Sequence, residues 1–213
     1  MIAPVRVKIC GITNPGDARI ALEAGADALG FNLYPGSKRF VRMEEILPWL
    51  ASLGGDAVKV AVMVNPTEAE IAGARAHFDV IQLHGQETPA QCAAAAAGGH
   101  IWKAFPLTAE LDADAVTACR AVALVIDSSV PGAFGGTGKL IDLAEAARFV
   151  QACHGLPVWL SGGLSPANVR EAIEKVKPYG VDVASGVEAV GNPRRKDAAR
   201  VRAFVAAARN AVA

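Results

Sequence analysis

The sequence predicts an α/β protein that folds as a single (β/α)8 barrel of the TIM type. Three observations favour this fold: short apolar runs rich in β-branched residues recur along the chain, helix signals fall between them, and polar residues or glycines stand where most runs end. Runs that are apolar almost throughout and alternate with helices are typical of a parallel sheet covered by helices. We therefore expect residues 1–213 to form one catalytic domain.

The strand candidates are eight in number, and their spacing suits one helix and two short loops between successive strands. They are Val5–Cys10, Ala28–Leu33, Ala57–Val64, Val80–Leu83, Ile101–Phe105, Ala123–Asp127, Val158–Ser161 and Val181–Ala184. Helix starts are indicated at Asn14-Pro15, Asn65-Pro66-Thr67 and Thr88-Pro89. Ser165-Pro166-Ala167-Asn168 precedes a helical stretch at Val169–Val176, and a last helix is expected at Asp197–Ala211. A doubly wound open sheet is the alternative, but the residues after the first run, Cys10-Gly11-Ile12-Thr13, are not a glycine-rich phosphate-binding motif.

Composition excludes several classes of function. The chain is 52% hydrophobic and has a formal net charge of zero, which argues against disorder and against a general nucleic-acid binder. The basic run Arg194–Lys196 is expected to be a solvated loop. No apolar stretch near the N-terminus is long enough for a signal peptide or membrane span, so we expect a cytoplasmic protein without a membrane partner.

The four cysteines form no CxxC pair and match neither a zinc site nor a disulfide framework. Cys92, Cys119 and Cys153 lie in helix-like stretches and are expected to be small buried residues. Cys10 differs because it ends the first strand candidate. In (β/α)8 barrels the active site lies at the C-terminal ends of the strands. The residues at those positions here are Cys10, Asn32, Asn65, His84, Lys103, Asp127, Gly162-Gly163 and Ser185-Gly186.

The last two of these ends predict a phosphate site. Gly162 and Gly163 follow the seventh strand, and Ser185 and Gly186 follow the eighth. Glycine lets backbone N–H groups approach an anion closely, and barrels usually bind phosphate at these two loops. The alternative is that the glycines only make tight turns. We favour phosphate binding because both loops carry them.

A glycine-rich segment follows the sixth strand and includes Gly135, Gly136, Thr137 and Gly138. Such a loop could close over a ligand and exclude water. The alternative is an ordinary surface loop.

Cys10 and Asp127 are candidates for an acid–base pair. Burial at the end of an apolar strand would raise the pKa of Asp127 and let it act as a general acid. A thiolate base at Cys10 would need its pKa lowered by a positive charge. Lys8, two residues earlier and on the same face of the strand, is the candidate for that charge. Each residue taken alone has a structural alternative, a turn or cap aspartate and a small core cysteine.

Along nearly its whole length the chain resembles the phosphoribosylanthranilate isomerases of tryptophan biosynthesis. The matching segments are Val7–Thr13, Gly25–Phe31, Ser37–Val41, Val64–Thr67, Gln82–Gly85, Asp127-Ser128, Gly135–Gly138, Ser161–Leu164 and Ser185–Glu188. The resemblance rests on the order of these segments, since any one of them alone is unspecific.

The resemblance implies an Amadori rearrangement of N-(5-phospho-β-D-ribosyl)anthranilate to 1-(2-carboxyphenylamino)-1-deoxy-D-ribulose 5-phosphate. It further implies that Asp127 is the general acid, that Cys10 is the general base, that Arg39 faces the anthranilate carboxylate and that His84 lines the site. Neither a metal nor an organic cofactor is expected. Ala184 departs from the family pattern, in which a serine often stands there, so one hydroxyl for the phosphate is missing.

Three rival functions stay open at this point. Indole-3-glycerol-phosphate synthase would need a catalytic lysine, for which Lys8 and Lys103 are available, but also glutamates at strand ends, which are absent. A metal-dependent sugar-phosphate epimerase would need more ligands than His84 and Asp127. A catalytically silent barrel would have no reason to keep Cys10, Asp127 and Arg39 together. We expect a monomer, with a homodimer as the alternative.

Overall fold

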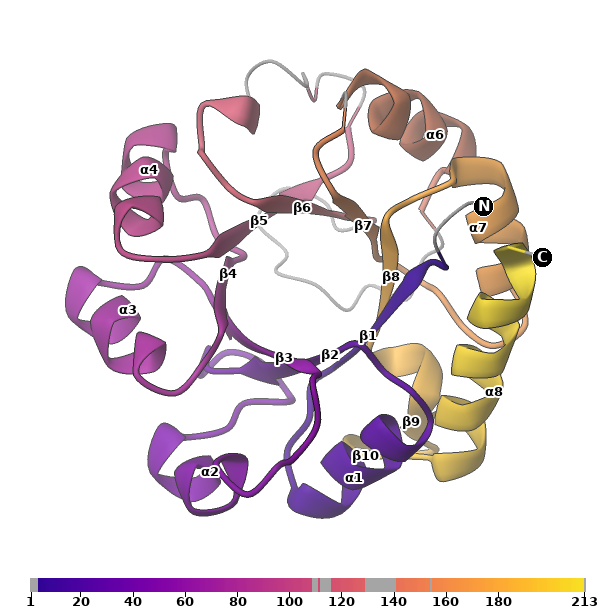
Figure 1. Ribbon diagram of the computed structural model, residues 1–213, viewed down its shortest axis with the longest axis horizontal. Helices are drawn as coiled ribbons and strands as arrows, with labels where there is room; N and C mark the ends of the chain where they lie inside the picture. Colours follow the sequence, from indigo (N-terminus) through magenta and orange to yellow (C-terminus); the bar gives the residue numbers. More distant parts are fainter. Residues whose placement is uncertain (1–3, 109–110, 112–115, 129–140, 154, 213) are drawn as a thin grey trace.

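The computed structural model describes residues 4–108, 111, 116–128, 141–153 and 155–212. Eight parallel strands close into a barrel with helices around it, which confirms the predicted fold class (Figure 1). Each strand pairs with its neighbours in sequence, and β1 also pairs with β8. The strands are β1 (Arg6–Cys10), β2 (Ala28–Asn32), β3 (Val58–Met63), β4 (Val80–Leu83), β5 (Ile101–Pro106), β6 (Ala123–Asp127), β7 (Val158–Leu160) and β8 (Gly180–Val183).

The inside of the barrel is packed at one end and polar further along. The rings of Trp102 and Trp159 stack with their centroids 4.8 Å apart and fill the interior together with small and β-branched side chains. Because strand side chains alternate between faces, the next inward positions lie closer to the C-terminal ends. Lys8, Gln82 and Asp182 occupy such positions and are buried. The polar layer forms the floor of the barrel mouth.

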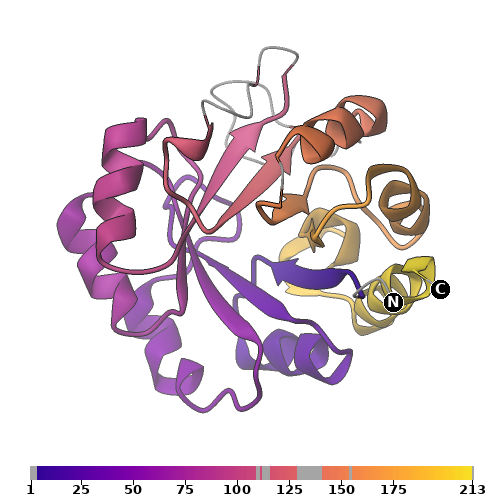
Figure 2. The ribbon, with the colours of Figure 1, turned by 45° about the horizontal axis from the view of Figure 1, so that its top comes forward.

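Helices cover the outer face of the barrel (Figures 1 and 2). They are α1 (Pro15–Glu23), α2 (Met43–Leu50), α3 (Glu68–Arg75), α4 (Pro89–Ala97), α6 (Leu143–Ala152), α7 (Val169–Val176) and α8 (Ala198–Arg209). The side chains of Asn14, Thr67 and Thr88 cap the helices that start at the predicted places. Asp197 likewise caps α8, which confirms the predicted last helix. Short 3-10 turns occur at η1 (Ser185–Val187) and η2 (Asn210–Val212).

One segment differs from the prediction. After η1 the chain forms a hairpin of β9 (Glu188–Ala189) and β10 (Asn192–Lys196), which contains the basic run expected to be a solvated loop. Arg194 and Arg195 are exposed, but Lys196 is only 5% exposed. The prediction was wrong for Lys196 because its ammonium group finds buried acceptors, Ala184 O at 3.0 Å and Glu188 Oε1 at 3.5 Å.

The two ends of the chain are held together by Asp27, which follows α1. Its Oδ2 accepts hydrogen bonds from Val7 N at 2.7 Å and Arg209 Nη2 at 2.6 Å, and Arg6 Nη1 lies 2.7 Å from Oδ1. Burial opposes the charge, but these donors outweigh it and lower the pKa of Asp27. Asp27 therefore joins β1 to α8, and the two termini lie side by side in both ribbon views.

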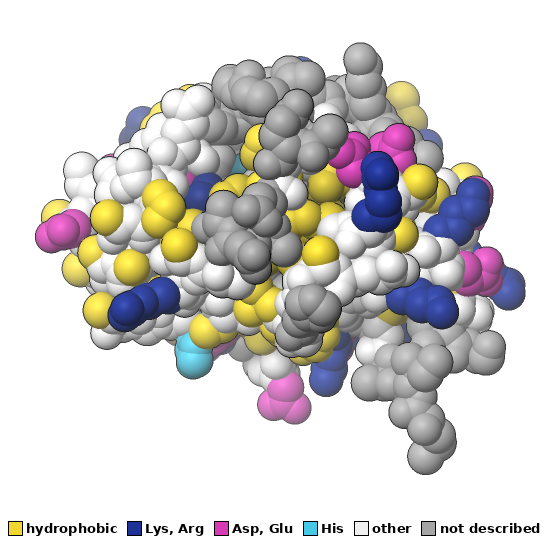
Figure 3. Space-filling view, turned by 90° about the horizontal axis from the view of Figure 1, so that it is seen from above, with side chains coloured by type: hydrophobic (Ala, Val, Ile, Leu, Met, Phe, Trp, Pro, Cys, Tyr) yellow, Lys and Arg dark blue, Asp and Glu magenta, His cyan; other side chains and the backbone are white. Residues whose placement is uncertain are grey.

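The surface carries mixed charge. In the view of Figure 3, cationic and anionic side chains are interspersed towards the right-hand side, in keeping with the net charge of zero. Within the part of the chain that the structure describes, no helix has the length and hydropathy needed to cross a membrane.

Candidate active site

A cavity opens at the C-terminal ends of the strands, where the sequence predicts the site. Its walls bring together Cys10 from β1, Asp127 from β6 and residues of the loops after β2, β7 and β8. The lining residues are Cys10, Asn32, Tyr34, Ser37, Arg39, Val62, Val64, Gln82, His84, Asp127, Ser128, Ser161, Gly162, Gly163, Leu164, Asp182, Val183, Ala184 and Ser185. Six of the strand-end positions predicted from sequence are represented in this set.

Cys10 lies above a buried ion pair. Lys8 Nζ, two residues earlier on the inner face of β1, is 2.8 Å from Asp182 Oδ2 of β8, and the side chains are 0% and 6% exposed. Burial disfavours the charge on Lys8, but the interactions with Asp182 and Cys10 outweigh it and raise the pKa of Lys8. Lys8 is thus the positive neighbour of Cys10 that the sequence indicated.

Lys8 does not make Cys10 a ready thiolate. Burial raises the pKa of the Cys10 thiol, Lys8 and Lys196 lower it, Asp182 raises it, and the net direction is upward. The pKa of Cys10 is therefore shifted in the direction opposite to the one that the acid–base account asks for.

Gly30 of β2 makes room for this arrangement. It pairs with Cys10 across the sheet, and a Cβ at this position would lie 2.7 Å from Cys10 Sγ and 3.1 Å from Lys8 Cε. The first of these distances is shorter than real Cβ contacts, so the Cys10 side chain would have to shift, and the second is tight. Glycine at position 30 therefore lets Cys10 and Lys8 keep their places.

Asp127 ends β6 with 5% of its surface exposed. Ser128 Oγ donates to its Oδ1 at 3.4 Å, and His84 Nε2 lies 3.8 Å from its Oδ2. Burial, together with the charges of Lys8 and Lys103, lowers the pKa of His84 to about 3, so the ring is neutral. The carboxyl therefore has an uncharged imidazole as its neighbour.

Arg39 enters the cavity from the loop after β2 and is held from the side. Its Nε lies 2.5 Å from Glu188 Oε1 of β9. Burial disfavours the guanidinium charge, but Glu188 outweighs it and raises the pKa of Arg39. Because Glu188 occupies Nε, the Nη groups stay available for a ligand. Gly11, with φ of 76°, leaves room for the Arg39 stem, since a Cβ there would overlap Arg39 Cδ.

Glu188 also binds Lys196, with Oε1 3.5 Å from the buried Nζ. Burial, the first cause, lowers the pKa of Lys196, although Glu188 opposes this. The predicted set of site residues missed Glu188, Lys196 and Asp182. Asp182 had a signal in the sequence, a charged residue between two valines in the last strand.

The glycine loops after β7 and β8 meet beside the cavity. Gly162 and Gly163 have φ of 95° and 66°, and a Cβ on Gly162 would lie 2.5 Å from Ser128 Oγ. Ser185 joins them in lining the cavity. Gly186 is not a lining residue, because it packs against the carbonyl of Leu164, where a Cβ would overlap the oxygen. The predicted lid residues Gly135, Gly136, Thr137 and Gly138 lie outside the described residues.

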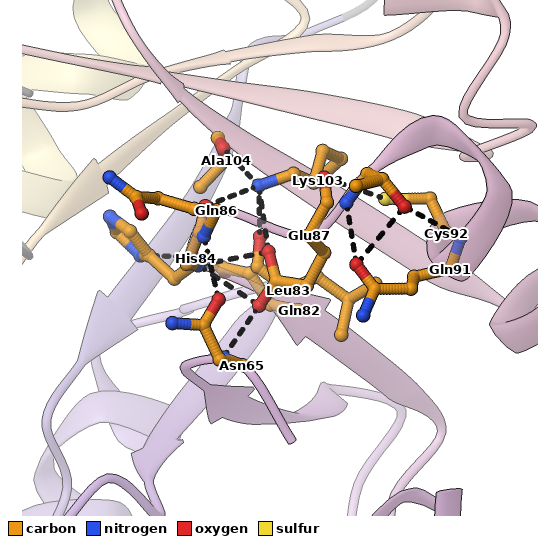
Figure 4. Close-up of polar contacts among 12 residues, drawn as sticks. Asn65, Gln82, Leu83, His84, Gln86, Glu87, Gln91, Cys92, Lys103 and Ala104 are labelled. Atoms are coloured by element: carbon orange, nitrogen blue, oxygen red, sulfur yellow. Dashed lines mark hydrogen bonds and ion pairs between the residues drawn. The ribbon is translucent and has the colours of Figure 1, made fainter. Parts of the chain in front are cut away.

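Lys103 does not reach the cavity, contrary to its place among the predicted strand ends. It lies within β5, and its alternation with the inward-facing Trp102 and Ala104 puts it on the outer face of the barrel. Its ammonium group is 2.9 Å from each of Gly85 O, Ala104 O and Glu87 Oε2 (Figure 4). Three donors thus meet three acceptors, and Lys103 is not available as a catalytic lysine.

Asn65 is likewise outside the cavity. Its φ of 47° places it in the left-handed region, its N–H donates to Glu87 Oε1 at 2.8 Å, and its Oδ1 accepts from Gln86 N at 2.8 Å (Figure 4). Asn65, Glu87 and Lys103 therefore fasten the ends of β3, β4 and β5 to one another behind His84. Among the residues that the structure describes, no cluster of three or more His, Cys, Asp and Glu side chains could hold a metal ion.

Comparison with known proteins agrees with this geometry. Residues 7–207 match the family model of N-(5'-phosphoribosyl)anthranilate (PRA) isomerase. The N-(5'-phosphoribosyl)anthranilate isomerase of Geobacter metallireducens is 44% identical over 205 residues, covering 94% of this chain and 97% of that protein.

Solved structures give the same result. A structure of monomers of the dimeric phosphoribosylanthranilate isomerase from Thermotoga maritima has a TM-score of 0.83 at 35% identity, covering 97% of this chain and 99% of that one. A phosphoribosylanthranilate isomerase in complex with reduced 1-(o-carboxyphenylamino)-1-deoxyribulose 5-phosphate has a TM-score of 0.84 at 34% identity, with the same coverage. The chain belongs to the N-(5'-phosphoribosyl)anthranilate isomerase family.

Proposed function

We propose that this protein converts N-(5-phospho-β-D-ribosyl)anthranilate to 1-(2-carboxyphenylamino)-1-deoxy-D-ribulose 5-phosphate in tryptophan biosynthesis, with Asp127 as general acid and Cys10 as general base. The observation that carries the assignment of roles is that Cys10 and Asp127, from strands far apart in the barrel, line one cavity together with Arg39 and both glycine loops. The cytoplasm is the proposed location.

The reaction needs two proton transfers at different atoms of the sugar. Asp127 gives its proton to the ring oxygen, the C1–O bond breaks, and the anthranilate nitrogen forms a Schiff base with C1. Cys10, once it has lost its own proton, then removes the proton from C2 as a thiolate, and the electron pair of that bond moves to give the enolamine. Tautomerisation of the enolamine yields the ketone. General acid and base catalysis contribute about 10²–10⁴-fold each.

Arg39 supports binding of the anthranilate end. A guanidinium presents N–H groups in a planar fork that matches a carboxylate. Glu188 holds Nε, so the two Nη groups form the face offered to the ligand. At the other end of the substrate, the positive φ angles of Gly162 and Gly163 and the Ser185 hydroxyl support phosphate binding.

The proposal can be tested with the purified protein and phosphoribosylanthranilate, whose anthranilate-type fluorescence is lost on reaction. We expect turnover without added metal and in the presence of a chelator, because every proposed step uses side chains of the chain. Activity that the chelator abolishes would contradict the cofactor-free mechanism.

The two roles are tested by Asp127→Asn and Cys10→Ser, which should each reduce kcat by about 100-fold or more. Asp197→Asn and Cys153→Ser are the matched controls. Asparagine caps a helix about as well as aspartate, and Cys153 lies at the end of α6. Near-normal kcat in either test variant would remove that residue from its role.

A further inference from the structure

Gln82 is a buried amide that the proposed mechanism does not use. It lies two residues before His84 on β4, so both side chains face the barrel interior, and it is only 1% exposed. Its Nε2 lies 3.1 Å from His84 Nδ1 (Figure 4). A buried amide in contact with an active-site imidazole has a direct effect on where the ring carries its proton.

The contact selects one tautomer of His84. In the orientation that the structure gives the Gln82 amide, its nitrogen faces the ring and donates, so Nδ1 accepts and the proton of the neutral ring is on Nε2. Nε2 is the atom that faces Asp127 Oδ2, at 3.8 Å. The ring therefore stands between a donor on one side and a carboxyl oxygen on the other, and a proton on Nε2 suits both neighbours.

Burial and nearby positive charge keep the ring neutral. Burial is the largest cause that lowers the pKa of His84, and the charges of Lys8 on β1 and of Lys103 on the outer face of β5 lower it further. Asp127 of β6 is the facing acid, while Asp182 of β8 and Glu87 of the loop after β4 are engaged by Lys8 and Lys103. Lys103 thus acts on the site from outside the barrel.

A neutral N–H donor suits a general acid better than an imidazolium would. A full positive charge beside Asp127 would hold its carboxyl ionised before reaction, and the acid would have no proton to give. A neutral N–H interacts more strongly once the carboxyl has released its proton, so it stabilises the transition state more than the ground state. The 3.8 Å between His84 Nε2 and Asp127 Oδ2 must shorten for this hydrogen bond to form during the reaction.

We propose that Gln82 is a positioning residue: by donating to Nδ1 it keeps His84 as the neutral Nε2–H tautomer, and this N–H stabilises the charge that Asp127 gains on giving up its proton. The inference rests on the proposed function, because it assumes that Asp127 is the acid.

The first test is ¹⁵N NMR of the full-length protein labelled at histidine. The ring nitrogens of His84 should show the Nε2–H tautomer from pH 8 down to pH 5 without conversion to imidazolium. The exposed His77 and His100 provide reference signals. An Nδ1–H tautomer, or an imidazolium within that range, would overturn the proposal.

The second test is Gln82→Met, which keeps the length of the side chain and removes the donor. We expect kcat to fall by about tenfold with KM nearly unchanged, and the His84 signals to shift towards the Nδ1–H tautomer. Gln86→Met is the matched control, since Gln86 is exposed in the next loop and its side chain is outside the cavity. Unchanged kcat and tautomer in Gln82→Met would refute the inference.

Gln82→Glu separates positioning from packing, because a carboxylate of the same shape accepts a hydrogen bond from Nδ1–H, whereas the amide donates one to Nδ1. His84 should then become an imidazolium at neutral pH, and the kcat–pH profile should change along with kcat. A profile identical to that of the wild type would contradict the inference. The proposed function fails separately, if the wild-type protein does not consume phosphoribosylanthranilate, whatever the tautomer of His84.

Discussion

Cys10 and Asp127 differ in how ready they are for their proposed roles. Asp127 is enclosed beside a neutral imidazole, an environment that suits a proton donor. The Cys10 thiol has a raised pKa because burial and Asp182 outweigh the help from Lys8 and Lys196. Cys10, rather than Asp127, is therefore the residue whose pKa must be lowered when the substrate binds.

Replacing Lys8 by methionine should raise the pKa of Cys10 further. Lys8 is the largest influence that lowers the pKa of this thiol, and Asp182 acts less strongly in the opposite direction. The reactive form is the thiolate, so alkylation of Cys10 by iodoacetamide should be slower at a given pH and its pH profile should move to higher pH.

The double variant Lys8→Met/Asp182→Asn guards against loss of folding, because it leaves no unpaired buried charge. It should also show a raised pKa for Cys10, since the larger influence has been removed. Lys175→Met, which breaks an exposed ion pair on α7, is the control. If the pH midpoint of alkylation in the double variant were equal to or lower than that of the wild type, this account of Cys10 would be contradicted.

Individual site residues can be predicted from the sequence when they stand at the end of an apolar strand. Cys10, Asp127 and His84 stand out because they end apolar strands. Glu188 and Lys196 follow the strands in a hairpin, where charged residues are ordinary. Only the folded chain brings Glu188 to Arg39 and Lys196 to Glu188. Lys103 gave a false signal, since a lysine in an apolar strand looks the same on either face of the barrel.

At the scale of elements, local capping chemistry predicted helix starts well. Thr67 and Thr88 form capping boxes with Glu70 and Gln91, a pattern readable from four consecutive residues. The start of the α2 helix was not located from the sequence, because it has no side-chain cap and the helix contains Pro48. The β9–β10 hairpin depends on contacts made after the barrel closes, which no local pattern records.

Asp27→Asn tests the clamp between β1 and α8. Loss of the charge should lower the free energy of unfolding by about 1.5–3 kcal/mol at pH 7, since a hydrogen bond to a charged group contributes about that much. The folded-state pKa of Asp27 is depressed, so its contribution is present above the unfolded-state pKa and disappears as pH falls through the folded-state pKa.

The difference between wild type and Asp27→Asn should therefore shrink in urea unfolding curves measured from pH 7 down to pH 3. Asp56→Asn, at an exposed position before β3, is the matched control. A difference that stays constant over this range would show that the charge of Asp27 does not stabilise the fold.

At the scale of the whole molecule, we propose that residues 1–213 form one domain that is a monomer in solution. Every strand of the closed barrel needs both neighbours, and the stacked pair Trp102–Trp159 lies in the shared interior. Thermal unfolding should show one transition, with the same midpoint by far-UV circular dichroism and by tryptophan fluorescence. Two separate midpoints would contradict a single domain, and light scattering at twice the chain mass would contradict the monomer.

The pairing of β1 with β8 has a consequence for how the protein is made. Lys8 and Asp182 touch although 174 positions separate them along the chain, so the surroundings of the thiol are assembled from the first strand and the last. Contacts between such distant positions form late, because closing a long loop costs entropy before anything is gained. A nascent chain on the ribosome contains Cys10 and Lys8 early, but it lacks Asp182 until synthesis is nearly complete. The rate at which catalytic turnover recovers after dilution from urea would therefore report the rate at which β1 pairs with β8.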